Sequence, residues 1–239
     1  DLSRCTEYTV EAGRPDTITA EKLAALKENG ADRVSVNPQS MSDKVLRAMG
    51  RSHTAADILS AYELVRNSGI PCVNMDLIAG LPEDSREGFR ATLDQVLAMD
   101  PANITVHTLA LKKGSRLMTE GGSLPTAEDV AAMLDYAWTA LREAGYAPYY
   151  LYRQKYMSGS FENVGWTRPG FENLYNICMM EELHTVLALG GGGVTKLVDR
   201  SAGRIERISD PKYPYEYINA IDHIIADKEK LADFYAAAR

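Results

Sequence analysis

An acidic residue stands in the middle of one of the most apolar stretches of the chain. Residues 73–82 read VNMDLIAGLP, and Asp76 is the only charged residue among them. Burying a carboxylate among aliphatic side chains is costly unless the carboxylate is paired or hydrogen-bonded. Side chains alternate along a strand, so Asp76 lies on the face opposite to Met75 and Leu77. The run therefore predicts a strand whose apolar residues build a core and whose acid belongs to a polar site.

Polar side chains also mark the ends of the other predicted strands. They are Glu11, Asn37, Gln39, Asn74, Asp76, His107 and Thr108, with Arg51 and His53 in a loop before the next helix. In parallel α/β folds the chemistry sits at the carboxyl ends of the strands. Any one of these residues alone is more often a satisfied core group. Together they suit a polar ligand better than a metal, because they could serve hydroxyls, an amine and a carboxylate.

Apolar strands alternate with amphipathic helices over the first part of the chain. We predict strands at 7–12, 32–39, 73–82 and 104–111, and helices at 19–30, 42–49, 54–69, 85–100 and 126–145. Capping boxes are expected at Thr54 with Asp57 and at Asp84 with Glu87. This alternation is typical of βα units and a parallel sheet, either a barrel or a doubly wound sheet.

The pattern changes after residue 145. Residues 146–157 are aromatic and strand-like, a Gly- and Pro-containing loop follows, and GGGG at 190–193 is expected to form a turn after a buried strand. The four glycines match neither a dinucleotide fingerprint nor a P-loop. We therefore predict a βα domain over 1–145 and a mixed α/β C-terminal extension that covers the substrate over 146–239.

Composition excludes several classes of protein. The net charge of -7 disfavours a nucleic-acid partner, which needs a basic face, and no apolar run approaches membrane-spanning length. Cys5, Cys72 and Cys178 lie far apart and form no CxxC pair, so no local zinc or iron–sulfur site is predicted. Reduced thiols and the lack of a signal peptide favour a cytoplasmic protein.

Two long stretches carry a family resemblance. They are SVNPQSMSDKVLRAMGRSHTAADILSAYELVRNSGI (35–70) and NMDLIAGLPEDSREGFRATLDQVLAMDPANITVHTLALKKGSRL (74–117). They contain, in order, a Gln after a strand, a GR-H loop, a DLI-GLP strand and an element similar to L-PGT-L. RPGFENLYN and LALGGGGVTKL add a looser match further on. The chain resembles the oxygen-independent coproporphyrinogen III oxidase-like radical SAM proteins, and most of all their coproporphyrinogen dehydrogenase branch.

The resemblance implies a partial (β/α) barrel of the radical SAM type, of which this chain carries the later strands. It also implies S-adenosyl-L-methionine and a [4Fe-4S] cluster as cofactors. The family holds the cluster with CxxxCxxC, which these 239 residues lack. We therefore expect no metal ligands in this chain and expect the chain to be a C-terminal fragment, inactive when isolated. An exposed sheet edge at 7–12 would favour a homodimer unless the extension covers it.

By position, the resemblance implies S-adenosylmethionine contacts at Glu11, Gln39, Arg51, Asp76, Ile78 and Ala110. Arg51 suits the methionyl carboxylate through a charge-assisted bond. Asp76 and Gln39 suit ribose hydroxyls, and Glu11 suits a hydroxyl or the ammonium group. Ile78 would pack against adenine, while the backbone of Ala110 would read its edge.

The implied activity is oxidative decarboxylation of coproporphyrinogen III to protoporphyrinogen IX in haem biosynthesis, with an electron donor as partner. The cofactors carry the difficult chemistry in such enzymes. Cationic candidates for the substrate propionates are Arg153, Arg168, Lys196 and Arg200, each of which is more often ordinary surface charge. Two other hypotheses stay open: a haem chaperone of the same superfamily, and a folded scaffold without activity.

Overall fold

The computed structural model describes residues 3–110, 123–153 and 161–236, which fall into two compact units, 1–173 and 174–239. The first unit is built on a six-stranded sheet with the order β1-β2-β3-β4-β6-β5. Its strands are β1 (Thr9–Gly13), β2 (Arg33–Val36), β3 (Cys72–Ala79), β4 (Asn103–Thr108), β5 (Ala147–Tyr152) and β6 (Asn163–Thr167). Strands β1 to β4 run parallel, as expected, and β1 lies at one edge.

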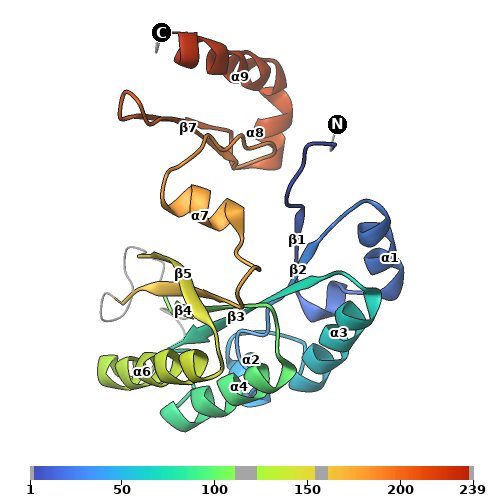
Figure 1. Ribbon diagram of the computed structural model, residues 1–239, viewed down its shortest axis with the longest axis vertical. Helices are drawn as coiled ribbons and strands as arrows, with labels where there is room; N and C mark the ends of the chain where they lie inside the picture. Colours follow the sequence, from blue (N-terminus) through green and yellow to red (C-terminus); the bar gives the residue numbers. More distant parts are fainter. Residues whose placement is uncertain (1–2, 111–122, 154–160, 237–239) are drawn as a thin grey trace. The chain divides into compact units, whose positions relative to one another are not determined.

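The helices of this unit lie along one side of the sheet (Figure 1). They are α1 (Ala20–Glu28), α2 (Asp43–Ala48), α3 (Ala55–Ser68), α4 (Arg86–Met99) and α6 (Ala127–Glu143), with a short 3-10 turn η1 (Pro15–Thr17) after β1. The predicted capping box at Thr54 and Asp57 is confirmed. The one expected at Asp84 is wrong: Ser85 caps α4, and its side chain accepts from the backbone of Gly88.

Alternation along β3 separates a core face from a polar face. Met75, Leu77 and Ala79 are fully buried in the main hydrophobic cluster, whereas Asn74, Asp76 and Ile78 are only half-buried. Burial of a side chain the size of Met75 or Leu77 contributes about 1.5 to 3 kcal/mol relative to exposure. A register slip by one residue would exchange the two faces, so burial of the apolar set also fixes the direction of Asp76.

The sheet does not end where the sequence pattern changes. The segment expected to be a loop contains β6, which pairs antiparallel with both β4 and β5. The expected boundary between residues 145 and 146 therefore falls inside the first unit, and the division between units follows Asn173. Pairing with β4 holds β6 in the sheet, and β6 in turn holds β5; the local sequence does not reveal either pairing.

The second unit contains α7 (Leu174–Met180), the antiparallel pair β7 (Val194–Asp199) and β8 (Arg204–Ser209), α8 (Pro214–Asn219) and α9 (Ile221–Ala236). Residues 190–193 precede β7, so the glycine turn leads into a strand and does not follow one. Lys228 of α9 donates to Asp210 and to Thr195, each at 2.9 Å. This buried ion pair ties α9 to the strand pair.

Candidate functional site

Asp76 is partnered but still accessible. The side-chain amide of Asn74 donates to Asp76 Oδ1 at 2.9 Å, and His107 Nε2 lies 3.6 Å from Asp76 Oδ2. The side chains of Asp76 and His107 keep 20% and 24% of their exposure. Both carboxylate oxygens are therefore oriented by neighbours while retaining lone pairs for a ligand.

A row of hydrogen-bonding groups crosses the sheet on both sides of Asp76. Ser35 is the register partner of Asn74, and its hydroxyl donates to Glu11 Oε2 at 2.6 Å. The row continues from Asp76 to His107, because Asp76 faces Thr105 and Ile78 faces His107 on β4. Glu11 and Asp76, which lie far apart in the chain, thus belong to one polar strip over β1 to β4.

Aromatic residues of β5 extend this strip. The Tyr152 hydroxyl lies 3.2 Å from His107 Nδ1, and the Tyr152 ring is parallel to that of Tyr150, with centroids 6.3 Å apart. A proton on Nε2 would face Asp76, which leaves Nδ1 to accept from the Tyr152 hydroxyl. Burial raises the pKa of Tyr150, whose hydroxyl lies 3.3 Å from Thr105. His107 is therefore fixed from two strands.

Gln39 holds a special backbone position beside β3. Its φ is +65°, in the left-handed region, and its side chain is buried. The Gln39 N–H donates to the Asp76 carbonyl at 2.9 Å, and the N–H of Ile78 donates to the Gln39 carbonyl at 3.1 Å. These bonds bring three of the predicted cofactor residues, Gln39, Asp76 and Ile78, together at the carboxyl end of β3.

The remaining predicted cofactor residues come from the surrounding loops and strands. Arg51 is half-exposed in the loop that follows α2, where its backbone N–H donates to Leu46. Glu11 is exposed on β1, and Ala110 is half-buried just beyond β4. The element expected to resemble L-PGT-L, residues 111–117, lies outside the described residues.

The four cationic substrate candidates are divided between the two units, with Arg153 and Arg168 in the first and Lys196 and Arg200 in the second. Arg153 directly follows Tyr152 at the end of β5 and forms an ion pair with Glu162 at 2.9 Å. In the second unit, the Lys196 ammonium donates to the Met179 carbonyl at 2.9 Å, while Arg200 is exposed just after β7. Within the first unit, Arg153 is the candidate that lies beside the polar strip.

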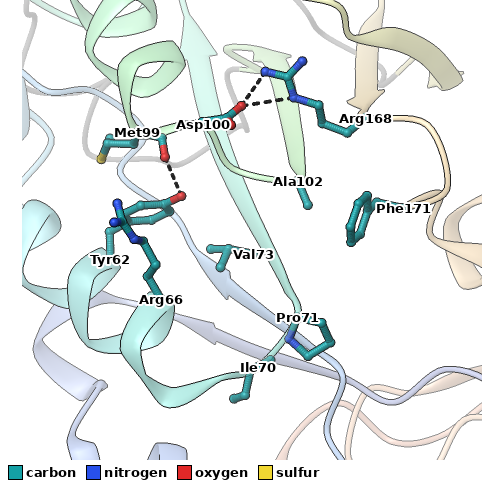
Figure 2. Close-up of a pocket in the computed structure, with 10 residues that line it drawn as sticks. All are labelled: Tyr62, Arg66, Ile70, Pro71, Val73, Met99, Asp100, Ala102, Arg168 and Phe171. Atoms are coloured by element: carbon teal, nitrogen blue, oxygen red, sulfur yellow. Dashed lines mark hydrogen bonds and ion pairs between the residues drawn. The ribbon is translucent and has the colours of Figure 1, made fainter.

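Arg168 lies at the opposite end of the sheet. It follows β6, whose last residue pairs with the first residue of β4. There its guanidinium forms an ion pair with Asp100, donates to the Ala144 carbonyl at 2.6 Å and lies over the Tyr146 ring. It lines a pocket of about 470 Å³ together with Tyr62, Arg66, Ile70, Pro71, Val73, Met99, Asp100, Ala102 and Phe171 (Figure 2). The structure therefore separates Arg168 from Asp76 and engages it in holding the fold.

Sequence reasoning missed the two tyrosines. Tyr150 and Tyr152 alternate in APYYLY, so a strand here places both on the same face. That spacing was the available signal, but the neighbour of β5 was not identifiable without β6. Within the described part of the chain, no three His, Cys, Asp or Glu side chains converge to hold a metal ion, and no helix is long and apolar enough to cross a membrane.

Comparison with known proteins gives the class first. Residues 6–96 match the model of the radical SAM superfamily, and the chain belongs to this superfamily. The match covers β1 to β3 and their helices, including the polar strip as far as Asp76. The expected partial barrel agrees with a solved structure, the coproporphyrinogen III oxidase HemN of Escherichia coli, a radical SAM enzyme. The two align with a TM-score of 0.68 at 19% identity, over 91% of this chain and 49% of that one.

Two curated proteins are similar to this chain over most of its length. The chain is 43% identical, over 96% of its length, to the oxygen-independent coproporphyrinogen-III oxidase-like protein HemZ of Bacillus subtilis, covering 46% of that protein. It is 29% identical, over 89% of its length, to the heme chaperone HemW of Haemophilus influenzae, covering 51% of it. The chain thus spans about half the length of these curated relatives.

Proposed function

We propose that this chain supplies the later part of the cofactor site in a radical S-adenosylmethionine enzyme that converts coproporphyrinogen III to protoporphyrinogen IX. The observation that carries the proposal is the polar strip centred on Asp76, at the carboxyl end of a sheet of the radical SAM type. The similarity to HemZ supports the assignment to the haem pathway.

The donor set fits S-adenosylmethionine group by group. Asp76 and Gln39 accept from and donate to ribose hydroxyls, and Arg51 pairs with the methionyl carboxylate. Glu11 takes a hydroxyl or the ammonium group. Ile78 offers apolar surface to adenine, and the backbone of Ala110 offers a hydrogen bond to its edge. When bound, the cofactor supplies hydrogen-atom abstraction; these residues only orient it and exclude water.

The cluster does not fit the described residues, because none of them form a metal-ligand group. No step is therefore assigned to it in this chain. The isolated chain is expected to bind the cofactor without cleaving it. In the first unit, Arg153 is the candidate for a substrate propionate beside the strip.

Calorimetry with S-adenosylhomocysteine tests the cofactor proposal without requiring turnover. We expect saturable 1:1 binding to this chain, and a weaker affinity for the Asp76→Ala variant. Arg168→Ala is the matched control, because it removes a charge at the other end of the sheet. If the folded protein binds no S-adenosylhomocysteine, the cofactor proposal is wrong.

The oxidation of coproporphyrinogen III is tested on a longer protein, one that also contains the region of the relatives that this chain does not cover. After anaerobic reconstitution with iron and sulfide, we expect it to consume coproporphyrinogen III and release the vinyl product. Similarity to HemW supports one alternative, a haem carrier. Stoichiometric haem binding without conversion of coproporphyrinogen III would favour that alternative.

A further inference from the structure

A pocket at the amino-terminal end of the sheet has aromatic walls (Figure 2). Its volume of about 470 Å³ falls within the range of about 300 to 1,000 Å³ that is usual for small-molecule sites. Every residue that lines it belongs to the first unit. Tyr62 and Arg66 form one side of the pocket, Phe171 forms the other, and Val73 of β3 lies between them.

Both aromatic walls are fixed by hydrogen bonds. The Tyr62 hydroxyl donates to the Met99 carbonyl at 2.7 Å. The Phe171 carbonyl accepts from the Arg33 guanidinium at 3.1 Å and from the Asn103 side chain at 2.9 Å, yet Phe171 remains 38% exposed. The backbone is thus held firmly beneath an apolar ring that faces solvent. Such a preformed surface can bind a planar apolar group at a low cost in conformational entropy.

The charges at the pocket favour an anionic ligand. Asp100 lines the pocket, but Arg168 already holds its carboxylate in an ion pair. Burial raises the pKa of Tyr62, so its phenol adds no negative charge. Arg66 is different, because its ion pair with Glu63 at 3.6 Å joins side chains that are 64% and 56% exposed. Such a surface pair is weak, so the Arg66 guanidinium remains available to an anion in the pocket.

Helical spacing places this charge beside the aromatic wall. Tyr62 and Arg66 are four residues apart in α3, so they lie on the same face of the helix. A guanidinium can bind a carboxylate through two parallel N–H···O bonds. A ligand that fits the pocket therefore combines a planar apolar body, held between Tyr62 and Phe171, with a carboxylate directed at Arg66.

We propose that this pocket is a second ligand site, which binds a small aromatic carboxylate with its ring system between Tyr62 and Phe171 and its carboxylate at Arg66. The site is separate from the cofactor site around Asp76, which lies at the other end of the sheet. The proposal concerns the first unit by itself and does not rest on the proposed function.

Chemical-shift mapping on isotope-labelled protein tests the position of the site. The probe is 2-naphthoate, and 2-naphthylmethanol is its neutral analogue. We expect saturable shifts at the amides of Val73, Ala102 and Phe171, whereas the amide of Gln39, at the other end of β3, should not shift. The neutral analogue should bind about tenfold more weakly, because it cannot make hydrogen bonds between charged groups.

Substitutions in the first unit separate the contribution of charge from that of shape. Arg66→Gln should weaken 2-naphthoate about tenfold and leave 2-naphthylmethanol unchanged. Glu63→Gln removes the competing carboxylate and should strengthen 2-naphthoate about twofold. Phe171→Leu should weaken both probes about fivefold, because it removes the aromatic wall and keeps the backbone hydrogen bonds. Arg47→Gln, at an exposed arginine of α2, is the matched control and should change neither affinity.

Three results would overturn the proposal: shifts that do not saturate or that lie outside the pocket, equal wild-type affinity for the two probes, and unchanged binding of 2-naphthoate by Arg66→Gln. Arg66 and Glu63 are exposed, so their variants are expected to fold. They decide the test if thermal unfolding shows that Phe171→Leu does not fold. Failure to bind S-adenosylhomocysteine would contradict the cofactor proposal alone.

Discussion

The two ends of the sheet treat their polar groups differently. At the amino-terminal end, Arg33 is buried, with its terminal nitrogens bonded to the backbone carbonyls of Phe171 and Glu172 and to the Asn103 side chain. Arg168 forms its ion pair with Asp100 there. At the carboxyl end, Asp76 is oriented yet open.

The difference separates groups that hold the fold from groups that await a ligand. Although Nε of Arg33 has no partner, its terminal nitrogens connect the loop at residues 171 and 172 to Asn103 of β4. His53 makes no side-chain hydrogen bond in the described structure. Its imidazole therefore does not hold the fold together through hydrogen bonds, as the Arg33 guanidinium does. A charged residue near a pocket is thus informative only after its existing partners are known.

Replacing Arg33 should give the largest effect. Arg33→Ala removes its bonds to the carbonyls of residues 171 and 172 and to Asn103, together with its ion pair to Glu7, so we expect about 3 to 5 kcal/mol less stability. Urea unfolding measures the change. Arg47→Ala, an exposed arginine on α2, is the control and should lie within about 0.5 kcal/mol of wild type. A loss for Arg33→Ala as small as the control would show that this end is not held by its charges.

Asp76→Asn should come next and act on binding. The shape is kept, but the carboxylate charge beside His107, which would accept from ribose hydroxyls, is lost. We expect S-adenosylhomocysteine to bind about 10- to 100-fold more weakly, since hydrogen bonds to charged groups contribute about 1.5 to 3 kcal/mol. Calorimetry gives the affinity and urea unfolding the stability. Wild-type affinity would mean that Asp76 is only a satisfied core acid.

Arg168→Ala sharpens the contrast at the other end. The ion pair with Asp100 is partly exposed, so its loss should cost about 1 kcal/mol or less of unfolding free energy. The affinity for S-adenosylhomocysteine should not change, because Arg168 is beyond the amino-terminal end of β4. A tenfold loss of affinity would show that Arg168 contributes to cofactor binding and that the two ends of the sheet do not act separately.

Tyr152→Phe should produce the smallest effect. It removes the hydroxyl beside His107 Nδ1 and keeps the ring. A neutral hydrogen bond contributes about 0.5 to 1.5 kcal/mol, so we expect S-adenosylhomocysteine to bind roughly threefold more weakly as His107 loosens. Tyr215→Phe, at a largely exposed tyrosine, serves as the comparison. Identical affinities for the two variants would show that His107 does not need this support.

The sequence predicted those parts of the fold that follow from local periodicity. The four parallel strands, their helices and the inward direction of Asp76 depend on alternation and caps, which a short window contains. β6 was missed because NVGWT is short and has a glycine at its centre, and its place is decided by pairing with β4.

For the candidate site, the sequence predicted which residues lie at the strand ends but not which of them already have partners. Residue type and position at a strand end selected Gln39, Asp76 and Ile78, which the structure brings together. The same reasoning selected Arg168, because a sequence does not show that Asp100 already engages it. The partner of His107 was hidden for the same reason, since Tyr152 reaches it from a strand whose neighbour was unknown.

Gly165 restricts the order in which substitutions at positions 150 and 165 can be accepted during evolution. The Tyr150 ring lies directly over it, and a methyl group at position 165 would come within 1.8 Å of that ring. Gly165→Ala is therefore excluded while Tyr150 is present, yet it becomes acceptable once residue 150 is small. Acquiring a side chain at 165 requires giving up the tyrosine first. A substitution at Gly165 is therefore tolerated only after Tyr150 has been replaced by a smaller residue.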